Sequence, residues 1–325
     1  MKEKILEALK NSKDFISGQE LSEKFQVSRT AIWKAIRSLK EQGYEVEAVR
    51  NKGYRLLFLP DLLTKDRIED TLQTKWAGHP TRYFDSLDST NNYAKKAAEN
   101  GAVSGTLIVS DIQTAGRGRK GRFWISPKGS GIWMSLILKP DIAPYHASML
   151  TLVMALATTR AIREISGITV GIKWPNDLVV EGKKICGILT EMSADPDQIN
   201  HIVIGVGINV GCMDFSEEIR VVATSIAEHT QTEFSRADLI ARILFQFEAV
   251  YDTFIQTEDL SGLMEEYNAL LLNCDKEVKI LDPKGSYEAL ALGINEQGEL
   301  LVWVEDELRK ITAGEVSVRG IYGYV

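Results

Sequence analysis

The pattern of hydrophobic and polar positions begins with helical stripes. In residues 1–60 the longest stripe places Ile32, Ile36 and Leu39 on one side of a predicted helix. Ser28 can cap this helix at its N-terminus. The period then shortens to two in YEVEAV and YRLLF, on either side of the turn RNKG. These patterns predict helix, turn and helix followed by a two-stranded hairpin.

Beyond the hairpin the pattern changes. Residues 65–270 alternate apolar strand signals with helix signals, which is typical of an α/β domain. Residues 272–325 contain short strand patterns separated by the turns DPKGS, NEQGE and EDE, which predicts a small antiparallel barrel. We therefore predict an α/β (α+β) protein with three domains, at residues 1–60, 65–270 and 272–325.

Composition narrows the class of protein. At 325 residues, with 44% of them hydrophobic, the chain can bury more than one core. No apolar run reaches the roughly 18 residues of a membrane span, and the charged start MKEKILEALK has no signal-peptide cleavage site. The cysteines Cys186, Cys212 and Cys274 have no metal-ligand spacing and leave one unpaired in any disulfide scheme. We expect a cytoplasmic protein without a membrane partner or a tightly bound metal.

Charge singles out the N-terminal region. The whole chain carries a net charge of −7, whereas residues 1–60 hold 12 Lys and Arg against 8 Asp and Glu. The exposed face of the predicted third helix carries polar and basic side chains, and the hairpin adds cations that can reach phosphates. This arrangement resembles the winged helix-turn-helix family. The predicted DNA-binding residues are Ser28, Arg29, Thr30, Trp33, Lys34, Arg37 and Lys52. The alternative is a three-helix bundle used for protein contacts.

The segment DSLDSTNNYAKKAA is the first candidate for chemistry in the central region. Ser89, Thr90 and Asn91 open a predicted helix and present hydroxyl, amide and backbone N–H groups together. Such a cluster suits a small polar head group. An ordinary helix N-cap is the alternative.

The segment GRGRKGRFW carries four cations within six residues, Arg117, Arg119, Lys120 and Arg122. They repel one another unless an anion lies among them, so we predict a polyphosphate site rather than a mobile surface turn. The glycines match G-x-G-x-x-G, but no helix follows, so we reject a dinucleotide fingerprint. A Walker A loop is absent from the sequence.

The segment GIKWPNDLVVEGKKICGIL predicts a lysine on a rigid strand. Lys173, Asn176 and Asp177 end one strand, and Lys184 begins another after a turn, near Gly187. A lysine there can neutralise a carboxylate and the phosphate that it attacks. A surface lysine is the alternative. In IVIGVGINVG, Asn209 offers an amide beside glycines that allow a close backbone approach.

Together these motifs resemble a known family. STNN, GRGRKGRFW, KWPND, KKICGIL and GVGINV occur in the order and spacing of the biotin protein ligases, and the N-terminal region resembles that of members which also repress the biotin operon. The resemblance covers essentially all 325 residues. It implies a mixed-sheet ligase domain like that of class II synthetases and an SH3-like C-terminal barrel.

The resemblance also implies an activity. Such an enzyme uses ATP and Mg²⁺ to convert biotin into biotinyl-5′-AMP, and transfers biotin to a lysine of a biotin carboxyl carrier protein. The acceptors would belong to carboxylases of the acetyl-CoA or pyruvate type. With biotinyl-AMP as corepressor, a homodimer would bind biotin operator DNA and repress the operon.

The resemblance assigns roles residue by residue. Lys184 and Arg119 would be catalytic, and Asp177 would help to position Mg²⁺. The implied biotin-binding residues are Ser89, Thr90, Asn91, Gln113, Gly116, Arg117, Gly118, Arg119, Lys184 and Gly187. The implied nucleotide-binding residues are Arg122, Trp124, Lys173, Asn176, Asn209 and Arg319, with Glu315 in the same C-terminal turn.

Two rival functions remain, a lipoate ligase of related fold and a repressor that senses biotin without chemistry. The GRGRKG segment argues against lipoate. The sequence also departs from some relatives, because no tryptophan occurs between Gly211 and Ser225 to cover the adenine. Val221 or Val222 is expected in its place.

Overall fold

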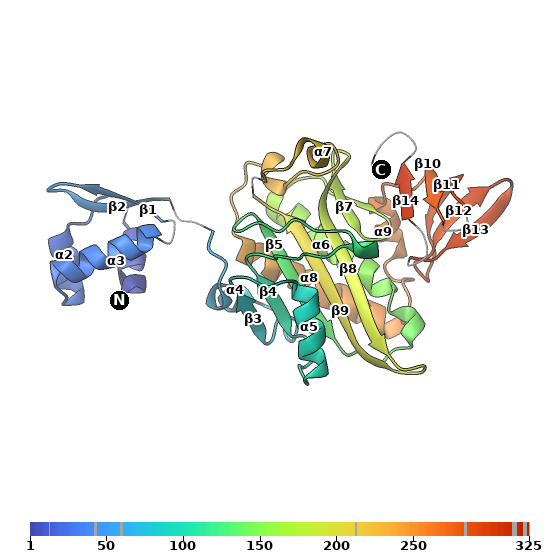
Figure 1. The fold of residues 1–325 in the computed structure, drawn as a ribbon, viewed down its shortest axis with the longest axis horizontal. Helices are drawn as coiled ribbons and strands as arrows, with labels where there is room; N and C mark the ends of the chain where they lie inside the picture. Colours follow the sequence, from blue (N-terminus) through green and yellow to red (C-terminus); the bar gives the residue numbers. More distant parts are fainter. Residues whose placement is uncertain are drawn as a thin grey trace. The chain divides into compact units, whose positions relative to one another are not determined.

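The computed structural model describes residues 1–12, 14–41, 44–58, 61–211, 213–282, 285–313, 317–320 and 324. Of Glu3, Phe58, Ser317 and Arg319 it describes the backbone alone. The chain forms two compact units, Met1–Leu62 and Leu63–Val325, which Figure 1 traces in sequence colours.

The first unit contains three helices and a hairpin, as the hydrophobic pattern predicted. Ile32, Ile36 and Leu39 are buried in its core together with Ile5 and Leu21. The Ser28 hydroxyl caps the third helix by accepting a hydrogen bond from the Ala31 backbone N–H at 3.2 Å. The elements are α1 (Lys2–Lys10), α2 (Gly18–Phe25), α3 (Arg29–Glu41), β1 (Glu45–Val49) and β2 (Gly53–Phe58).

A seven-stranded mixed sheet forms the centre of the second unit. Its strand order is β3-β4-β5-β9-β8-β7-β6; β3 and β4 are parallel, and every other neighbouring pair is antiparallel. This confirms the predicted mixed sheet. The strands are β3 (Thr81–Phe84), β4 (Leu107–Ser110), β5 (Gly131–Leu138), β6 (Gly171–Lys173), β7 (Asp177–Val180), β8 (Lys183–Ala194) and β9 (Ile199–Asn209).

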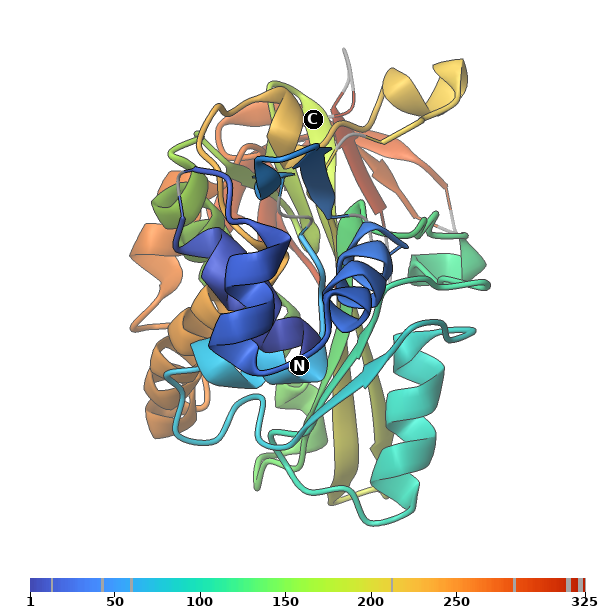
Figure 2. The same cartoon turned by 90° about the vertical axis from the view of Figure 1, so that its left-hand side faces the viewer.

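Helices cover both faces of this sheet. Successive strand residues point to opposite faces, so Leu107 and Val109 pack against α6 (Met149–Ser166) and α8 (Arg236–Thr257). Ile108 lies on the other face, against α5 (Thr90–Glu99), and Figure 2 shows α5 and α8 on opposite sides of the strands. None of the described helices is long and apolar enough to cross a membrane.

Shorter elements complete the covering layers. They are α4 (Lys65–Thr71), η1 (Arg119–Gly121), η2 (Pro144–His146), α7 (Glu217–Arg220), η3 (Ile226–Glu228) and α9 (Met264–Leu270).

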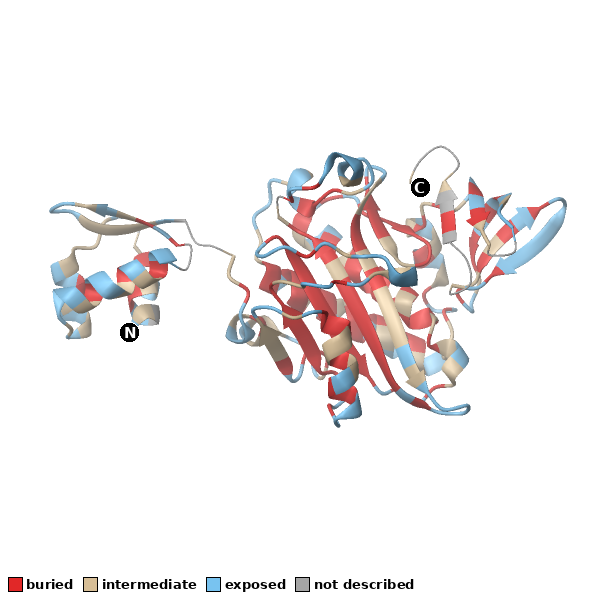
Figure 3. Cartoon of the chain, viewed as in Figure 1, coloured by how far each residue is buried: buried red, intermediate tan, exposed pale blue. Residues whose placement is uncertain are grey.

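The C-terminal strands form an antiparallel sheet in the order β13-β12-β11-β10-β14. Figure 3 shows its buried positions alternating with exposed ones. Trp174 joins it to the central sheet, because the indole Nε1 donates to the carbonyl of Gly298 at 3.1 Å. This hydrogen bond helps to fix the turn between β6 and β7. The strands are β10 (Lys276–Leu281), β11 (Tyr287–Ile294), β12 (Leu300–Val304), β13 (Glu307–Ile311) and β14 (Ser317–Gly320).

Candidate active site

A small cavity lies where the N-terminus of α5 meets the centre of the sheet. Ser89 caps α5, with its hydroxyl 3.5 Å from the backbone N–H of Asn92. Both the backbone N–H and the hydroxyl of Thr90 donate to Oε1 of Gln113, at 2.9 and 3.1 Å. The wall is polar on this side, whereas Met134 and Val206 line the sheet side. The cavity therefore suits a compact ligand with one polar and one apolar part.

Asn91 is the most constrained side chain of this wall. Its Oδ1 lies 2.6 Å from the hydroxyl of Ser135, and its Nδ2 donates to Glu191 at 2.8 Å and to the Leu189 carbonyl at 3.2 Å. A Cβ added at Gly205 would lie 2.1 Å from Asn91 Oδ1. Glycine at 205 is thus required for the strand to pass beneath the amide.

The glycine-rich segment folds as a short hairpin over the cavity. The Trp124 N–H donates to the Gly116 carbonyl at 2.9 Å, and the Gly118 N–H donates to the Arg122 carbonyl at 2.7 Å. At the tip, Lys120 adopts a left-handed backbone with φ of +55°. We refer to residues 116–124 as the glycine-rich hairpin.

Lys184 lies on the boundary between the small cavity and a second cavity that adjoins it. It is the second residue of β8, and its ammonium is 2.5 Å from Oδ1 of Asp177 and 5.1 Å from the centre of the Trp124 ring. Asn176 donates to the same Asp177 oxygen at 3.0 Å and accepts from Arg119 Nη1 at 2.8 Å. A lysine, an arginine and an amide therefore converge at one point, as acyl or phosphoryl transfer requires.

A second cavity, of about 760 Å³, adjoins the first and shares Gly118, Arg119, Trp124, Asn176 and Lys184 with it. Five of its lining residues are cationic, and Asp177 is the acidic one. Burial lowers the pKa of the Arg119 guanidinium, which Asp177 partly offsets. So many cations around one acid favour a polyanionic ligand in this cavity.

Most of the predicted ligand-binding residues meet at these cavities. The residues predicted to bind biotin line the small cavity, except Gly116, where an added Cβ would lie 2.3 Å from the Trp124 carbonyl oxygen. The predicted nucleotide residues that line the larger cavity are Arg122, Trp124, Lys173 and Asn176, together with Val221 and Val222, the expected adenine cover.

One predicted residue that the structure describes does not line either cavity. Asn209 is buried and donates its amide to the Thr224 carbonyl at 3.0 Å, outside both cavities. Glu315 and the side chain of Arg319 lie outside the described residues.

The structure also brings residues to the site that the sequence patterns did not single out. Ser135 and Glu191 fix the Asn91 amide, and Tyr324 donates its hydroxyl to Asp177 Oδ2 at 2.5 Å. Phe123, which is 86% exposed, lines the larger cavity. A signal existed for the close approach at 205–207, where GVG interrupts an apolar strand.

The structure of the described residues gives no cluster of three or more His, Cys, Asp or Glu side chains that could hold a metal ion. Cys186 is fully buried, and this burial raises the pKa of its thiol. Its role is packing.

In the first unit, the predicted DNA-binding side chains of α3 share one exposed face. Arg29, Thr30, Lys34 and Arg37 are exposed, and Trp33 is 52% exposed. Arg37 pairs with Glu41 at 2.9 Å, one turn further along α3. The face is free of core packing and rich in donors.

Comparisons with known proteins agree with this geometry. Residues 83–209 match the model of the biotin/lipoate A/B protein ligase family. Residues 2–55 match a helix-turn-helix domain, and residues 274–319 match the biotin protein ligase C-terminal domain.

Whole-chain relatives extend the agreement. The bifunctional ligase/repressor BirA of Bacillus subtilis (strain 168) is 41% identical over 94% of each chain. BirA of Escherichia coli (strain K12) is 30% identical over 97% of this chain and 96% of its own. The structure of the Aquifex aeolicus biotin protein ligase in complex with biotin and ATP superposes with a TM-score of 0.66 at 30% identity, covering 74% of this chain and 98% of that one.

Proposed function

The chain belongs to the biotin protein ligase family, among the members that carry a helix-turn-helix repressor domain, and we propose that its paired cavities carry out both steps of biotin transfer. It is a ligase that joins biotin to protein at the expense of ATP. The proposal assigns the steps of that reaction to named residues.

One observation carries the proposal. Lys184, Arg119 and Asn176 lie on the boundary of two adjoining cavities, one lined by hydroxyls, amides and apolar strand residues and the other by cations. Biotin has a compact polar ring system and a carboxylate, which match the polar and apolar lining of the first cavity once the glycine-rich hairpin opens. ATP fits the second. The biotin carboxylate and the α-phosphate then meet beside Lys184.

In the first step, a carboxylate oxygen of biotin attacks the α-phosphorus of ATP and pyrophosphate leaves. Two anions must approach each other, and Lys184 and Arg119 lower their repulsion in the transition state. Lys120, Arg122 and Lys173 line the cavity that receives the phosphates. The product is biotinyl-5′-AMP.

In the second step, the neutral amine of an acceptor lysine attacks the acyl carbon of biotinyl-AMP, and AMP leaves. The mixed anhydride is reactive towards water, so the glycine-rich hairpin has to cover it until the acceptor arrives. We propose carrier domains of acetyl-CoA carboxylase and pyruvate carboxylase type as acceptors, and the cytoplasm as the location.

Mg²⁺ enters as part of the substrate MgATP. Magnesium bound with nucleotides takes one or two protein carboxylates and otherwise phosphate and water oxygens. Asp177 is the carboxylate on the wall of the larger cavity, so it fits the role of a single protein ligand. Its oxygens would first have to exchange Lys184 and Tyr324 for the metal.

The helix-turn-helix domain adds the second activity. We propose that biotinyl-AMP, when no acceptor consumes it, favours a homodimer whose two α3 helices bind a palindromic operator of the biotin genes.

The experiment is to incubate the purified protein with biotin, MgATP and an acceptor carrier domain, and to follow pyrophosphate release and acceptor mass. Lys184→Ala should abolish both signals, whereas Lys183→Ala, the neighbouring lysine outside both cavities, should not. Preference for lipoate would contradict the proposal in favour of a lipoate ligase. Biotin binding without pyrophosphate release would indicate a repressor without chemistry.

A further inference from the structure

The glycine-rich hairpin is tied to both walls of the small cavity by the side chains of two arginines. Arg119 Nη1 donates to Asn176 Oδ1 at 2.8 Å, on the β6–β7 side. Arg117 Nη1 donates to Asn92 Oδ1 at 2.9 Å, on the α5 side. Arg117 does not line the larger, cationic cavity. Its guanidinium lines the small cavity and ties the hairpin to α5, and the phosphate contacts fall to the other cations.

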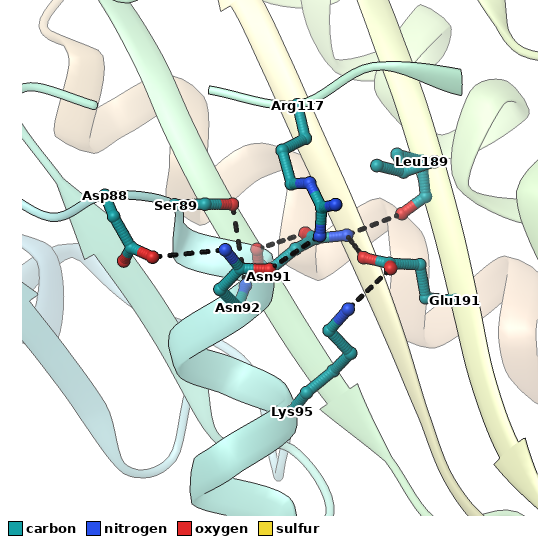
Figure 4. A network of polar contacts seen from close by, with 9 residues as sticks. Asp88, Ser89, Asn91, Asn92, Lys95, Arg117, Leu189 and Glu191 are labelled. Atoms are coloured by element: carbon teal, nitrogen blue, oxygen red, sulfur yellow. Dashed lines mark hydrogen bonds and ion pairs between the residues drawn. The ribbon is translucent and has the colours of Figure 1, made fainter. Parts of the chain in front are cut away.

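Asn92 is itself held by a carboxylate. Its Nδ2 donates to Asp88 Oδ2 at 3.1 Å, which orients the amide so that Oδ1 faces Arg117. Figure 4 shows Asp88, Asn92 and Arg117 in one continuous row across the N-terminus of α5. The hydrogen bond from Asn92 is the largest cause of the lowered pKa of Asp88, so the carboxylate is ionised and a strong acceptor at neutral pH.

A second carboxylate faces the same guanidinium. Glu191 on β8 pairs with Lys95 at 2.6 Å and accepts from Asn91. Burial raises the pKa of Glu191, the hydrogen bonds from Lys95 and Asn91 outweigh it, and the charge of Arg117 lowers the pKa further. Arg117 is thus drawn towards α5 and β8 by electrostatic attraction as well as by the Asn92 hydrogen bond.

The cavity beneath the hairpin is narrow in this arrangement, at about 50 Å³. Pockets for small ligands usually enclose about 300–1,000 Å³. The hairpin must therefore lift to admit a ligand and settle again over it, and each cycle must break and reform the contacts that tie it down.

We propose that Asp88 and Asn92 are positioning residues that latch Arg117, and so hold the glycine-rich hairpin over the biotinyl-AMP intermediate until the acceptor lysine reaches it. The inference rests on the proposed function, because the latch retains the adenylate that the ligase forms. Neither residue touches the reacting atoms. Loss of the latch should leave adenylation possible and let the intermediate escape.

The experiment measures coupling, which is the pyrophosphate released per biotin transferred at limiting acceptor, in the full-length protein with biotin and MgATP. Asn92→Ala should raise this ratio about tenfold, the effect of losing one hydrogen bond to a charged group. Free biotinyl-AMP should accumulate in the medium. The first turnover of adenylation should stay within about threefold of wild type.

An exchange of the two side chains supplies the rescue. In Asp88→Asn/Asn92→Asp, the carboxylate at 92 accepts from Arg117 and the amide at 88 donates to it, so the ratio should return towards wild type. Asn92→Asp alone places two carboxylates side by side, so the ratio of pyrophosphate to transferred biotin should stay above that of wild type. Asn100→Ala, at the other end of α5, controls for loss of helix stability, since the Asn100 side chain donates to the Lys96 carbonyl of the same helix.

The outcomes separate the two proposals. An unchanged ratio in Asn92→Ala, or an equal rise in Asn100→Ala, would overturn the latch while the ligase assignment stands. A wild-type protein without biotin-dependent pyrophosphate release would overturn the proposed function and the latch together.

Discussion

The ammonium of Lys184 lies 2.5 Å from Oδ1 of Asp177, and the other oxygen of this carboxylate accepts the Tyr324 hydroxyl at 2.5 Å. Both partners of the ion pair are largely buried, at 22% and 15% side-chain exposure. The pair holds the ammonium of Lys184 in place at the start of β8. It also means that the substrate anions have to compete with Asp177 for the lysine.

Asp177 provides the first prediction. Asp177→Asn keeps the size of the side chain but removes the carboxylate, so the Mg²⁺ concentration for half-maximal adenylation should rise about tenfold or more. A Mg²⁺ titration at fixed ATP measures this. Asp195→Asn, in the exposed β8–β9 turn, should leave the midpoint in place. An unchanged Mg²⁺ midpoint in Asp177→Asn would show that Asp177 is not a magnesium ligand.

Gly205 provides the second prediction. In Gly205→Ala the new Cβ would lie 2.1 Å from Asn91 Oδ1, and three hydrogen-bond partners prevent the amide from moving away. We expect a loss of about 1–3 kcal/mol in the free energy of unfolding and weaker biotin binding. Denaturant unfolding and calorimetric titration with biotin measure the two effects. Gly211→Ala is the matched control, because its Cβ would have ordinary contacts at 3.7 Å. Equal behaviour of the two variants would refute the prediction.

The exposed face of α3 provides the third prediction. Arg29→Ala combined with Lys34→Ala should abolish retardation of biotin operator DNA and leave ligase activity unchanged. The slope of log K for DNA binding against log salt concentration should become shallower by about 0.9 for each phosphate contact that is lost. Lys96→Ala, in the second unit, controls for charge alone. Operator binding that survives the double substitution would contradict the assignment of the DNA contacts to this face of α3.

Glu191 provides a prediction on pH. Burial alone would raise the pKa of Glu191, but hydrogen bonds from Lys95 and Asn91 outweigh it, and the net shift is downward from 4.5. The unfolded chain then takes up the proton first as the pH falls. Ionised Glu191 therefore stabilises the fold above about pH 4.5, and this contribution is lost as the pH falls through the lowered value.

The measurement is denaturant unfolding at neutral and acidic pH. Glu191→Gln should be less stable than wild type at pH 7, and the difference in the free energy of unfolding should disappear at acidic pH. Glu99→Gln, an exposed position at the end of α5, serves as the comparison. A difference in the free energy of unfolding that is the same at every pH would show that the charge of Glu191 does not contribute to stability.

Local patterns determined much of this protein from the sequence alone. The stripe of Ile32, Ile36 and Leu39 and the Ser28 cap lie within one helix, so their geometry follows from helical periodicity. The cations of the glycine-rich hairpin are adjacent in the chain, and their mutual repulsion indicated an anion before any fold was known. The motif order also indicated the family.

The tertiary structure alone decided how these parts are held. Asn91 meets Glu191 across 100 residues, and Tyr324 meets Asp177 across 147. The amide of Asn209 donates to the Thr224 carbonyl 15 residues further along the chain, a partner that the sequence pattern did not indicate. The physical reason is that hydrogen bonds between distant segments leave no periodic trace in the sequence, whereas helical stripes and clustered charges do.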